Sequence, residues 1–282
     1  TIVLSRVGTD SRQIDAGELF VALSGERFDA HDFLINVAKS GAGAALISNA
    51  GQCPTNLPAI CIADTRVGLG NLAKAWRANY EIPLALVTGS NGKTTVKEMI
   101  ASIFKAAVGE AHTLVTKGNL NNEIGLPLTL LKLRATDRLA VVELGMNHPG
   151  ETAQLAAIAQ ANIALINNAQ REHQEFMGTV EAVARENGAV IKSLPADGVA
   201  VFPADDDYTS VWRALAGKRK VLTFGFTDAD ITASFVWEAG AWQVKASTPA
   251  GAIHYALHMA GKHNVKNSLA AVTCALAADV TL

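Results

Sequence analysis

The chain has 282 residues, of which 49% are hydrophobic and 18% charged, and its formal net charge is -2. So many apolar residues exclude a disordered chain, and the near-neutral charge provides no global basic field that would point to nucleic acid. Charged residues or Gly and Asn interrupt every apolar run before the ~18 to 20 residues that would span a membrane. The three cysteines lack CxxC spacing and the first residues carry no signal-peptide pattern, so we expect a cytoplasmic protein with reduced thiols.

Residues 1–82 are predicted to form a small α/β unit. Apolar runs at 19–23 and 58–62 are typical of short strands, and residues 32–47 combine helical spacing with a final apolar run. Helical spacing over 66–80 predicts a helix that leads out of this unit. The proline of "EIP" (81–83) disfavours a longer helix, so we place a domain boundary near residue 82.

Strands and helices alternate from residue 83. The predicted strands are "LALVTG", "RLAVVELG", "IALINNA" and "GVAVFPAD", and the predicted helices cover 93–107, 151–161 and 179–194. This alternation predicts a mainly parallel sheet with helices on both faces. Beyond residue 218, the runs "KVLTFGF", "ITASFVWEAG", "AWQVKAST" and "AIHYALH" predict an antiparallel meander, and a helix follows over 262–280.

The stretch "LALVTGSNGKTTVKEMI" (84–100) places a Gly-rich turn between a predicted strand and a predicted helix. Such a turn directs backbone N–H groups and the positive end of the helix toward one point, as phosphate oxygens require. Val87 occupies the first glycine position of the GxxxxGK[ST] pattern, so this is a shortened form of the loop. The predicted phosphate-binding residues are Gly89, Ser90, Asn91, Gly92, Lys93, Thr94 and Thr95.

In this loop Lys93 would reach the β- and γ-phosphates, and the Thr94 hydroxyl would bind Mg²⁺. Glu143 ends one predicted strand and His173 follows another, at the sheet edge where ligands bind in open parallel sheets. We therefore predict a metal site formed by Thr94, Glu143 and His173. Alternatively, Glu143 caps the next helix and His173 is an ordinary surface residue. The loop alone would suit a kinase, a GTPase switch or an ATP-driven ligase.

Five motifs occur in the order found in Mur ligases, namely "TGSNGKTTVKEM", "KGNLNNEIGLPLTLL", "VVELGMNHPGE", "INNAQREHQEFMGTVEAVA" and "GKHNVKNSLAA". Together with "TDSRQIDAGELFVALSGERFDAHDF", they show that nearly the whole chain resembles the Mur ligase family. The resemblance implies an α/β fold with a small N-terminal α/β substrate domain (1–82) and a P-loop-type, mainly parallel ATPase domain (83–282) with an antiparallel addition. It also implies a C-terminal ligase domain that no segment here matches, so we expect a truncated chain that is inactive alone.

The resemblance implies an ATP- and Mg²⁺-dependent ligase of peptidoglycan precursor synthesis. Such an enzyme joins D-Ala-D-Ala to UDP-MurNAc-tripeptide through an acyl phosphate. Apart from the resemblance, we expect a monomer without a nucleic-acid partner. By similarity Lys93, Glu143 and His173 are catalytic. Residues implied near the adenine are His263, Asn264 and Asn267; those implied near the UDP end are Ser11, Arg12, Arg27 and His31; those implied to face the substrate are Asn119, Asn121 and Asn122.

Plainer roles stay open for several of these residues. Asn264 could be a helix N-cap, the arginines could be surface residues, and the asparagines of "GNLNN" could simply build a turn. The Asp205–Asp207 run reads as a solvated turn that could also touch ribose.

Two positions depart from the family pattern. Asn187 stands where many members have a carbamylated lysine, so a second metal would lose a ligand or take water or Glu186 instead. Pro203 stands where related sequences often have an asparagine that contacts the base, and proline offers no side-chain hydrogen bond.

Two other functions are compatible with the phosphate loop alone. Folylpolyglutamate synthetase, another amide ligase, resembles Mur ligases only from the phosphate loop onward and lacks the N-terminal unit. A nucleotide-binding switch is disfavoured because the base-reading motifs of a GTPase are missing from the sequence.

Overall fold

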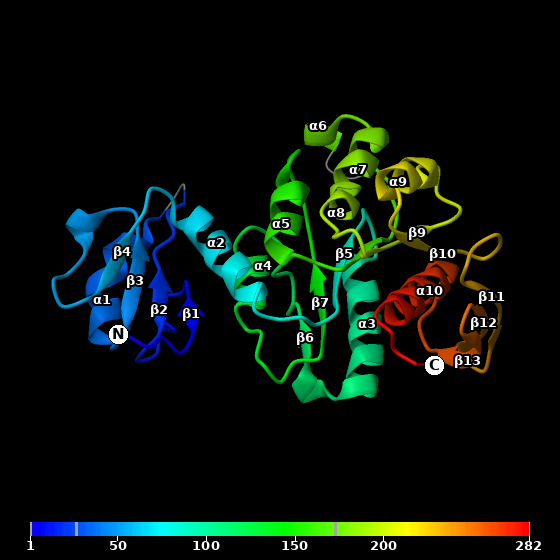
Figure 1. Ribbon diagram of the computed structural model, residues 1–282, viewed down its shortest axis with the longest axis horizontal. Coiled ribbons are helices and arrows are strands. Elements are labelled where there is room, and N and C mark those ends of the chain that lie inside the picture. Colours follow the sequence, from blue (N-terminus) through cyan, green and yellow to red (C-terminus); the bar gives the residue numbers. More distant parts are fainter. Residues whose placement is uncertain (1, 26–27, 172–173, 282) are drawn as a thin grey trace.

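The computed structural model describes residues 2–25, 28–171 and 174–281. Over these residues the strands form three sheets that follow one another along the chain. Figure 1 shows the first sheet at one end of an elongated molecule, with helix α2 (Thr65–Arg77) leading from it to a larger body that contains the other two. None of the helices in this described part combines the length and apolar character needed to cross a bilayer.

The first sheet is parallel throughout, with the strand order β1-β2-β3-β4. Phe20 and Ala45 pack with Leu34 of α1 on one face, whereas Val21 and Leu46 pack with Leu69 of α2 on the other. A strand buried on both faces has a continuous apolar sequence, which is why β2 and β3 were recognisable as apolar runs. The elements before α2 are β1 (Val7–Gly8), β2 (Leu19–Val21), η1 (Ala30–Phe33), α1 (Leu34–Lys39), β3 (Ala44–Ile47), η2 (Ala50–Gln52) and β4 (Ala59–Cys61).

The end of α2 is fastened to the larger body. Trp76 Nε1 and Tyr80 Oη donate hydrogen bonds to the same acceptor, Leu133 O, at 3.1 and 3.0 Å. The buried guanidinium of Arg77 donates to Tyr80 O and, at 3.3 Å, to Ile82 O. The predicted junction at 81–83 is therefore a hydrogen-bonded segment between the two sheets.

The second sheet is the centre of the larger body. All its strands are parallel, in the order β10-β9-β8-β5-β7-β6. The chain leaves β5 toward β6 and β7 and then returns to the other side of β5 for β8, so β5 lies at a topological switch point, where open α/β sheets bind ligands. The strands are β5 (Leu84–Thr88), β6 (Thr113–Val115), β7 (Leu139–Glu143), β8 (Ile163–Ile166), β9 (Val199–Pro203) and β10 (Lys220–Phe224).

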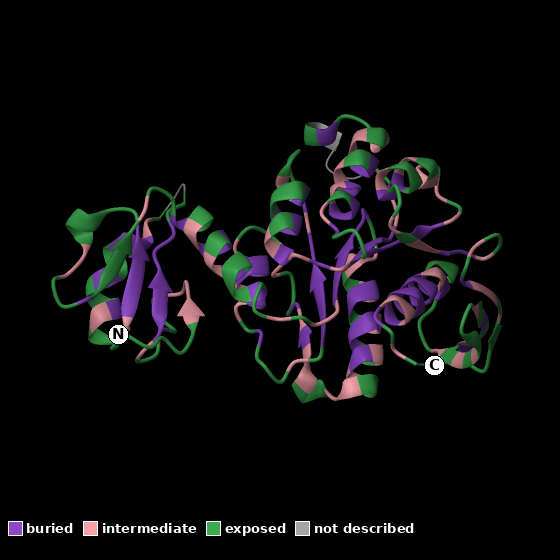
Figure 2. Ribbon diagram, viewed as in Figure 1, coloured by how far each residue is buried: buried purple, intermediate pink, exposed green. Residues whose placement is uncertain are grey.

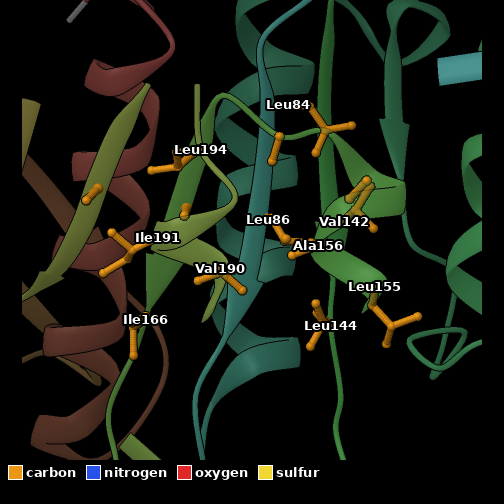
Figure 3. Packing of buried hydrophobic residues seen from close by; sticks show 14 of the residues in the cluster. Leu84, Leu86, Val142, Leu144, Leu155, Ala156, Ile166, Val190, Ile191 and Leu194 are labelled. Atoms are coloured by element: carbon orange, nitrogen blue, oxygen red, sulfur yellow. The ribbon is translucent and has the colours of Figure 1, made fainter. Parts of the chain in front are cut away.

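Helices cover both faces of this sheet. Figure 3 shows Leu84 and Leu86 of β5 packed toward Ala156 of α5 and Val190 of α8. On the other face α3 and α10 lie side by side (Figure 1), and burial is continuous along the strands between the layers (Figure 2). The helices are α3 (Lys93–Val108), η3 (Glu110–His112), α4 (Gly125–Leu130), α5 (Glu151–Ala159), α6 (Gln174–Met177), α7 (Val180–Asn187), α8 (Ala189–Lys192), α9 (Thr209–Ala216) and α10 (Lys262–Ala277).

The prediction of an antiparallel meander was correct for three strands and wrong for one. β11 (Thr232–Glu238), β12 (Ala241–Thr248) and β13 (Gly251–Leu257) form the antiparallel sheet. The run at Lys220–Phe224 instead pairs in parallel with β9 as the edge of the second sheet. The reason is α9, an unpredicted helix whose buried Trp212 packs on the sheet and which carries the chain across from β9 to β10.

The helix predicted over 179–194 is divided at Gly188 into α7 and α8. Leu215 of α9 lies so close that a Cβ at Gly188 would be 2.4 Å from its Cδ1. The short strands β1 and β6 were also missed, because two or three residues carry too little pattern.

Candidate active site

The loop between β5 and α3 has the backbone of a phosphate-binding turn. Gly89 and Gly92 have φ values of 130° and 77°, which disfavour any residue with a side chain. Space forbids one as well, because a Cβ at Gly89 would lie 3.0 Å from the backbone nitrogens of Asn167 and Asn168. Both glycines are thus needed to bring the loop close to the end of β8.

The end of β8 holds the loop in place through hydrogen bonds. Asn168 accepts from Ser90 N through its carbonyl at 3.1 Å and from Asn91 N through Oδ1 at 2.9 Å. Asn167 Nδ2 donates to Asn91 O at 2.8 Å. Because the N–H groups of Ser90 and Asn91 are engaged in this way, an anion would meet the N–H groups that begin α3, which lack partners within the helix.

Lys93 is the first residue of α3, and its ammonium group points toward the preceding residues of the loop. Its Nζ donates to Gly89 O at 2.6 Å and to Ser90 O at 3.2 Å. Thr94 beside it is exposed and Thr95 is half-buried. The lysine charge is therefore already directed at the turn where a phosphate would bind.

Glu143 ends β7, in register with Val87 of β5. It is 2% exposed, and its Oε1 accepts a hydrogen bond from Asn121 Nδ2 at 2.7 Å. Its Oε2 is buried without a hydrogen-bond partner among the described residues. An unpaired buried carboxylate oxygen is costly, so this atom is suited to a cation.

A hard divalent cation such as Mg²⁺ fits this arrangement, because it prefers oxygen ligands and accepts phosphate and water as the remainder. Glu143 offers a carboxylate oxygen and Thr94 an exposed hydroxyl. The described residues contain no group of three His, Cys, Asp or Glu side chains that could form a metal cage by itself. The third predicted ligand, His173, lies outside the described residues.

A chain of asparagine amides links the loop to α10. Asn167 Nδ2 donates to Asn267 Oδ1 at 3.0 Å as well as to the loop, and Asn267 Nδ2 donates to Asn264 Oδ1 at 3.1 Å. Asn264 in turn donates to Ala260 O at 2.7 Å. The N-cap of α10 is Gly261, so the alternative that Asn264 is the N-cap was wrong.

A polar cavity of about 340 Å³ opens between this chain of amides and the β9–α9 turn. Lys266 forms an ion pair across it with Asp205. Its lining residues are Asn167, Asn168, Ala169, Gln170, Asp205, Asp206, Asp207, His263, Lys266 and Asn267. The size and the position beside the phosphate loop suit a nucleoside.

The acidic run in this cavity is more than a solvated turn. Asp206 accepts hydrogen bonds from Ala169 N at 3.2 Å and Tyr208 N at 3.0 Å. Its burial raises the pKa of the carboxyl group, and the hydrogen bonds to Tyr208 and Ala169 counteract only part of that. The expectation of a plain solvated turn was therefore wrong for Asp206, which fixes the turn against the end of β8.

The Mur ligase middle domain model matches residues 87–275, which is more than half of the chain. The chain belongs to the Mur ligase family. A further model, described as the Mur ligase family catalytic domain, matches residues 3–91. The UDP-N-acetylmuramoyl-tripeptide--D-alanyl-D-alanine ligase of Escherichia coli (strain K12) is 39% identical over 284 residues, which cover 100% of this chain and 62% of that protein.

Solved Mur ligases share this structure. A crystal structure of MurF from Acinetobacter baumannii aligns with a TM-score of 0.92 at 36% identity, covering 98% of this chain and 60% of that one. The MurF ligase from Thermotoga maritima in complex with ADP aligns with a TM-score of 0.89 at 25% identity, covering 100% and 65%. The predicted α/β fold is confirmed, and the chain spans about three fifths of the length of the curated relatives it matches.

In this Mur ligase chain, Asn187 is a buried residue beneath the phosphate loop. Its Oδ1 accepts from Thr88 Oγ1 at 2.8 Å, and its Nδ2 is buried without a partner in the described structure. Glu186, the other group considered in place of a carbamate, binds the start of α5, because its Oε1 accepts from Gly150 N and Thr152 N at 3.0 Å each. Pro203 ends β9, and its carbonyl accepts from Thr209 Oγ1 at 2.8 Å.

The three asparagines after β6 occupy different environments. Asn121 contacts Glu143, as described above, and so belongs to the candidate metal site. Asn122 Oδ1 accepts at 2.9 Å from the N of Gly125, the first residue of α4, which is the turn-building role left open from sequence. Asn119 is exposed.

The N-terminal unit has its own cavity, of about 370 Å³, next to the carboxyl ends of β2, β3 and β4. Sequence reasoning missed the residues that line it, although Ser24 and Ser48 follow predicted strands closely. The lining consists of Ser24, Gly25, Ser48, Ala63, Asp64, Thr65 and Arg66.

The described residues among those predicted to bind UDP differ in how far they are exposed. His31 is buried; its Nδ1 contacts Asp29 Oδ1 at 2.5 Å and its Nε2 accepts from Ser48 N at 2.9 Å. It could therefore act on a ligand only by positioning Ser48. Arg12 is exposed and forms a two-point pair with Asp10, and Ser11 is half-buried. Arg27 lies outside the described residues.

Proposed function

We propose that this chain forms the UDP-substrate-binding and nucleotide-binding parts of a cytoplasmic, monomeric ligase that joins D-Ala-D-Ala to UDP-MurNAc-tripeptide with ATP and Mg²⁺. The names of the relatives support the reaction, and the ADP complex of a solved MurF supports the nucleotide. The observation that carries the proposal is the buried, unpartnered Oε2 of Glu143 on the strand next to the phosphate loop.

We assign the nucleotide to residues 83–282. The triphosphate would bind at the start of α3, where Lys93 Nζ exchanges the carbonyls of Gly89 and Ser90 for phosphate oxygens. The adenosine would lie in the cavity beside Asn267, His263 and Asn264. The chain of amides fixes the loop against α10, so the phosphate and nucleoside subsites stay in one geometry.

Glu143, Thr94 and His173 would bind the Mg²⁺. When bound, the cation neutralises charge on the β- and γ-phosphate oxygens. Glu143 can serve because Asn121 occupies only one of its oxygens.

We assign the UDP end of the acyl substrate to residues 1–82, with Ser11, Arg12, Arg27 and His31 near it and Asn119, Asn121 and Asn122 along its path. The carboxylate of the tripeptide would attack the γ-phosphate, which forms an acyl phosphate and releases ADP. The amine of D-Ala-D-Ala would then attack the acyl carbon and displace phosphate. Such a reaction depends on charge stabilisation by groups like Lys93 rather than on a nucleophilic side chain.

Isothermal titration of the chain tests the proposal. ATP should bind more tightly with Mg²⁺ than with EDTA, and UDP-MurNAc-tripeptide should bind whereas a folate should not. A folded chain that fails to bind the UDP-substrate, or that binds a folate in its place, would refute the assignment.

A further inference from the structure

The most unusual charged group in the described structure is Lys97, which is 0% exposed. It lies one helical turn after Lys93 in α3. Its Nζ donates to Thr116 O at 3.0 Å and contacts Glu98 Oε1 at 2.7 Å. Removing an ammonium group from water is costly unless it gains such partners, so this side chain fixes Thr116 firmly to α3.

Thr116 connects this lysine to the candidate metal ligand. It follows β6 directly, it is fully buried, and its backbone N donates to Val141 O at 3.2 Å. Its hydroxyl oxygen accepts a hydrogen bond from Glu143 N at 3.0 Å. Lys97 therefore acts on the backbone of Glu143 through a single intervening residue.

The same segment reaches Glu143 a second time, through the side chain. Asn121 donates from Nδ2 to Glu143 Oε1 at 2.7 Å, and its own carbonyl accepts from Gly145 N at 2.9 Å. A Cβ at Gly145 would lie 3.0 Å from Asn121 Nδ2, so the Asn121 side chain packs closely against the backbone of Gly145. The segment 116–121 thus fixes Glu143 at its amide and at one carboxylate oxygen.

We propose that Lys97 is a positioning residue that orients Glu143 toward the divalent cation by anchoring segment 116–121 to α3. The inference rests on the proposed function, because it takes Glu143 as the metal ligand. One helix then sets both parts of the site: Lys93 faces the phosphate, and Lys97, one turn later, determines where the carboxylate lies. The positions of the nucleotide and of the cation are consequently both set by α3.

The variant Lys97→Met tests this, because it keeps the length of the side chain and removes the ammonium group. The Mg²⁺ concentration that gives half of the cation-dependent increase in ATP affinity should rise about tenfold, as for other residues that orient a metal ligand. ATP affinity in EDTA should stay within about twofold, since Lys93 and the loop are intact. Backbone amides of residues 116–121 should exchange with solvent faster. Lys105→Met, at a half-buried position of the same helix whose ammonium group pairs with the exposed Glu110, is the matched control and should change none of these.

Thr116→Val removes only the hydroxyl acceptor of Glu143 N and provides a second, milder variant. It should also raise the Mg²⁺ requirement, and the double variant should be no worse than the more affected single variant, because both act along one path. If Lys97→Met fails to fold, Thr116→Val decides the question. An unchanged Mg²⁺ requirement, or an equal loss of ATP affinity with and without Mg²⁺, would overturn the inference. If the wild type instead binds ATP with the same affinity in Mg²⁺ and in EDTA, the proposed function itself is refuted.

Discussion

Asn167 and Asn267 lie 100 positions apart in the chain, and the Nδ2 of the first donates to the Oδ1 of the second at 3.0 Å. This contact joins the end of β8 to α10 beside the phosphate loop, where Gly92 leaves the space that the two side chains use. A Cβ at Gly92 would lie 2.9 Å from Asn167 Nδ2 and 3.1 Å from Asn267 Oδ1.

Gly92→Ala should therefore have two effects: it should strain the left-handed backbone, and it should also displace the side chains of Asn167 and Asn267. Gly92 has φ 77°, and Gly178, with φ 72°, has open space where a Cβ would be, so Gly178→Ala is a matched control. Both variants should lose about 1 to 2 kcal/mol of unfolding free energy from the left-handed backbone. Only Gly92→Ala should also lose about tenfold or more in ATP affinity, because it displaces the amide pair. Equal ATP affinities in calorimetry would contradict the role given to this contact.

Lys93→Ala should reduce ATP affinity about a hundredfold, since a charge-assisted hydrogen bond to phosphate is lost. Affinity for UDP-MurNAc-tripeptide should remain nearly that of the wild type, because the substrate's UDP end is assigned to the N-terminal unit. Two titrations of the same preparation measure both values. A similar loss of both affinities would argue against separate sites.

Glu143→Gln should abolish the effect of Mg²⁺ on ATP affinity while leaving affinity in EDTA nearly unchanged. The neutral side chain can still accept from Asn121, but it no longer buries an unpaired charge. We therefore expect the unfolding free energy in EDTA to rise by about 1 kcal/mol. Thermal melts in EDTA and in excess Mg²⁺ measure this, with the exposed Glu110→Gln as control. If Glu143→Gln is instead less stable than the wild type in EDTA, the Glu143 carboxylate has a stabilising partner in the folded chain, which contradicts this prediction.

Asp206 should make stability fall as the pH rises. Its folded-state pKa is raised above 3.8 by burial, so between about pH 3.8 and that raised value the folded chain holds more protons than the unfolded chain. Stability is therefore lost as the pH increases through this window. Relative to Asp206→Asn, the wild type should become progressively less stable from pH 4 upward in melts at constant ionic strength. A difference that does not change with pH would refute the assignment of a raised pKa to this residue.

Sequence could predict the parts of the site that local pattern determines. A strand, a Gly-rich turn and a helix start lie within one short stretch, so the strand–turn–helix around the predicted phosphate loop was placed correctly. The place of Glu143 at the end of a strand beside the loop was also predicted, because side chains at strand ends in a parallel sheet meet at one edge. The family motifs then predicted the nucleotide and the reaction.

Contacts between distant segments could not be predicted in this way. Glu186 lies in a helix of ordinary pattern, yet it binds backbone N–H groups 34 and 36 residues earlier. Asn187 meets Thr88 across 99 residues, and His31 is used to hold Ser48. β10 was assigned to the wrong sheet because the sequence of a short strand does not show which strand it pairs with. Here the pairing with β9 depends on how α9 packs.

The bonds at the end of α2 constrain how the molecule can move. Trp76 and Tyr80 share Leu133 O, and Arg77 secures the backbone up to Ile82, so residues 76–82 offer no slack between the two parallel sheets. A swing of the first sheet about this connection would strain the hydrogen bonds of Trp76 and Tyr80 to Leu133 O. A ligand that reached from the cavity at β2–β4 to the loop after β5 would therefore cross a distance set by this connection.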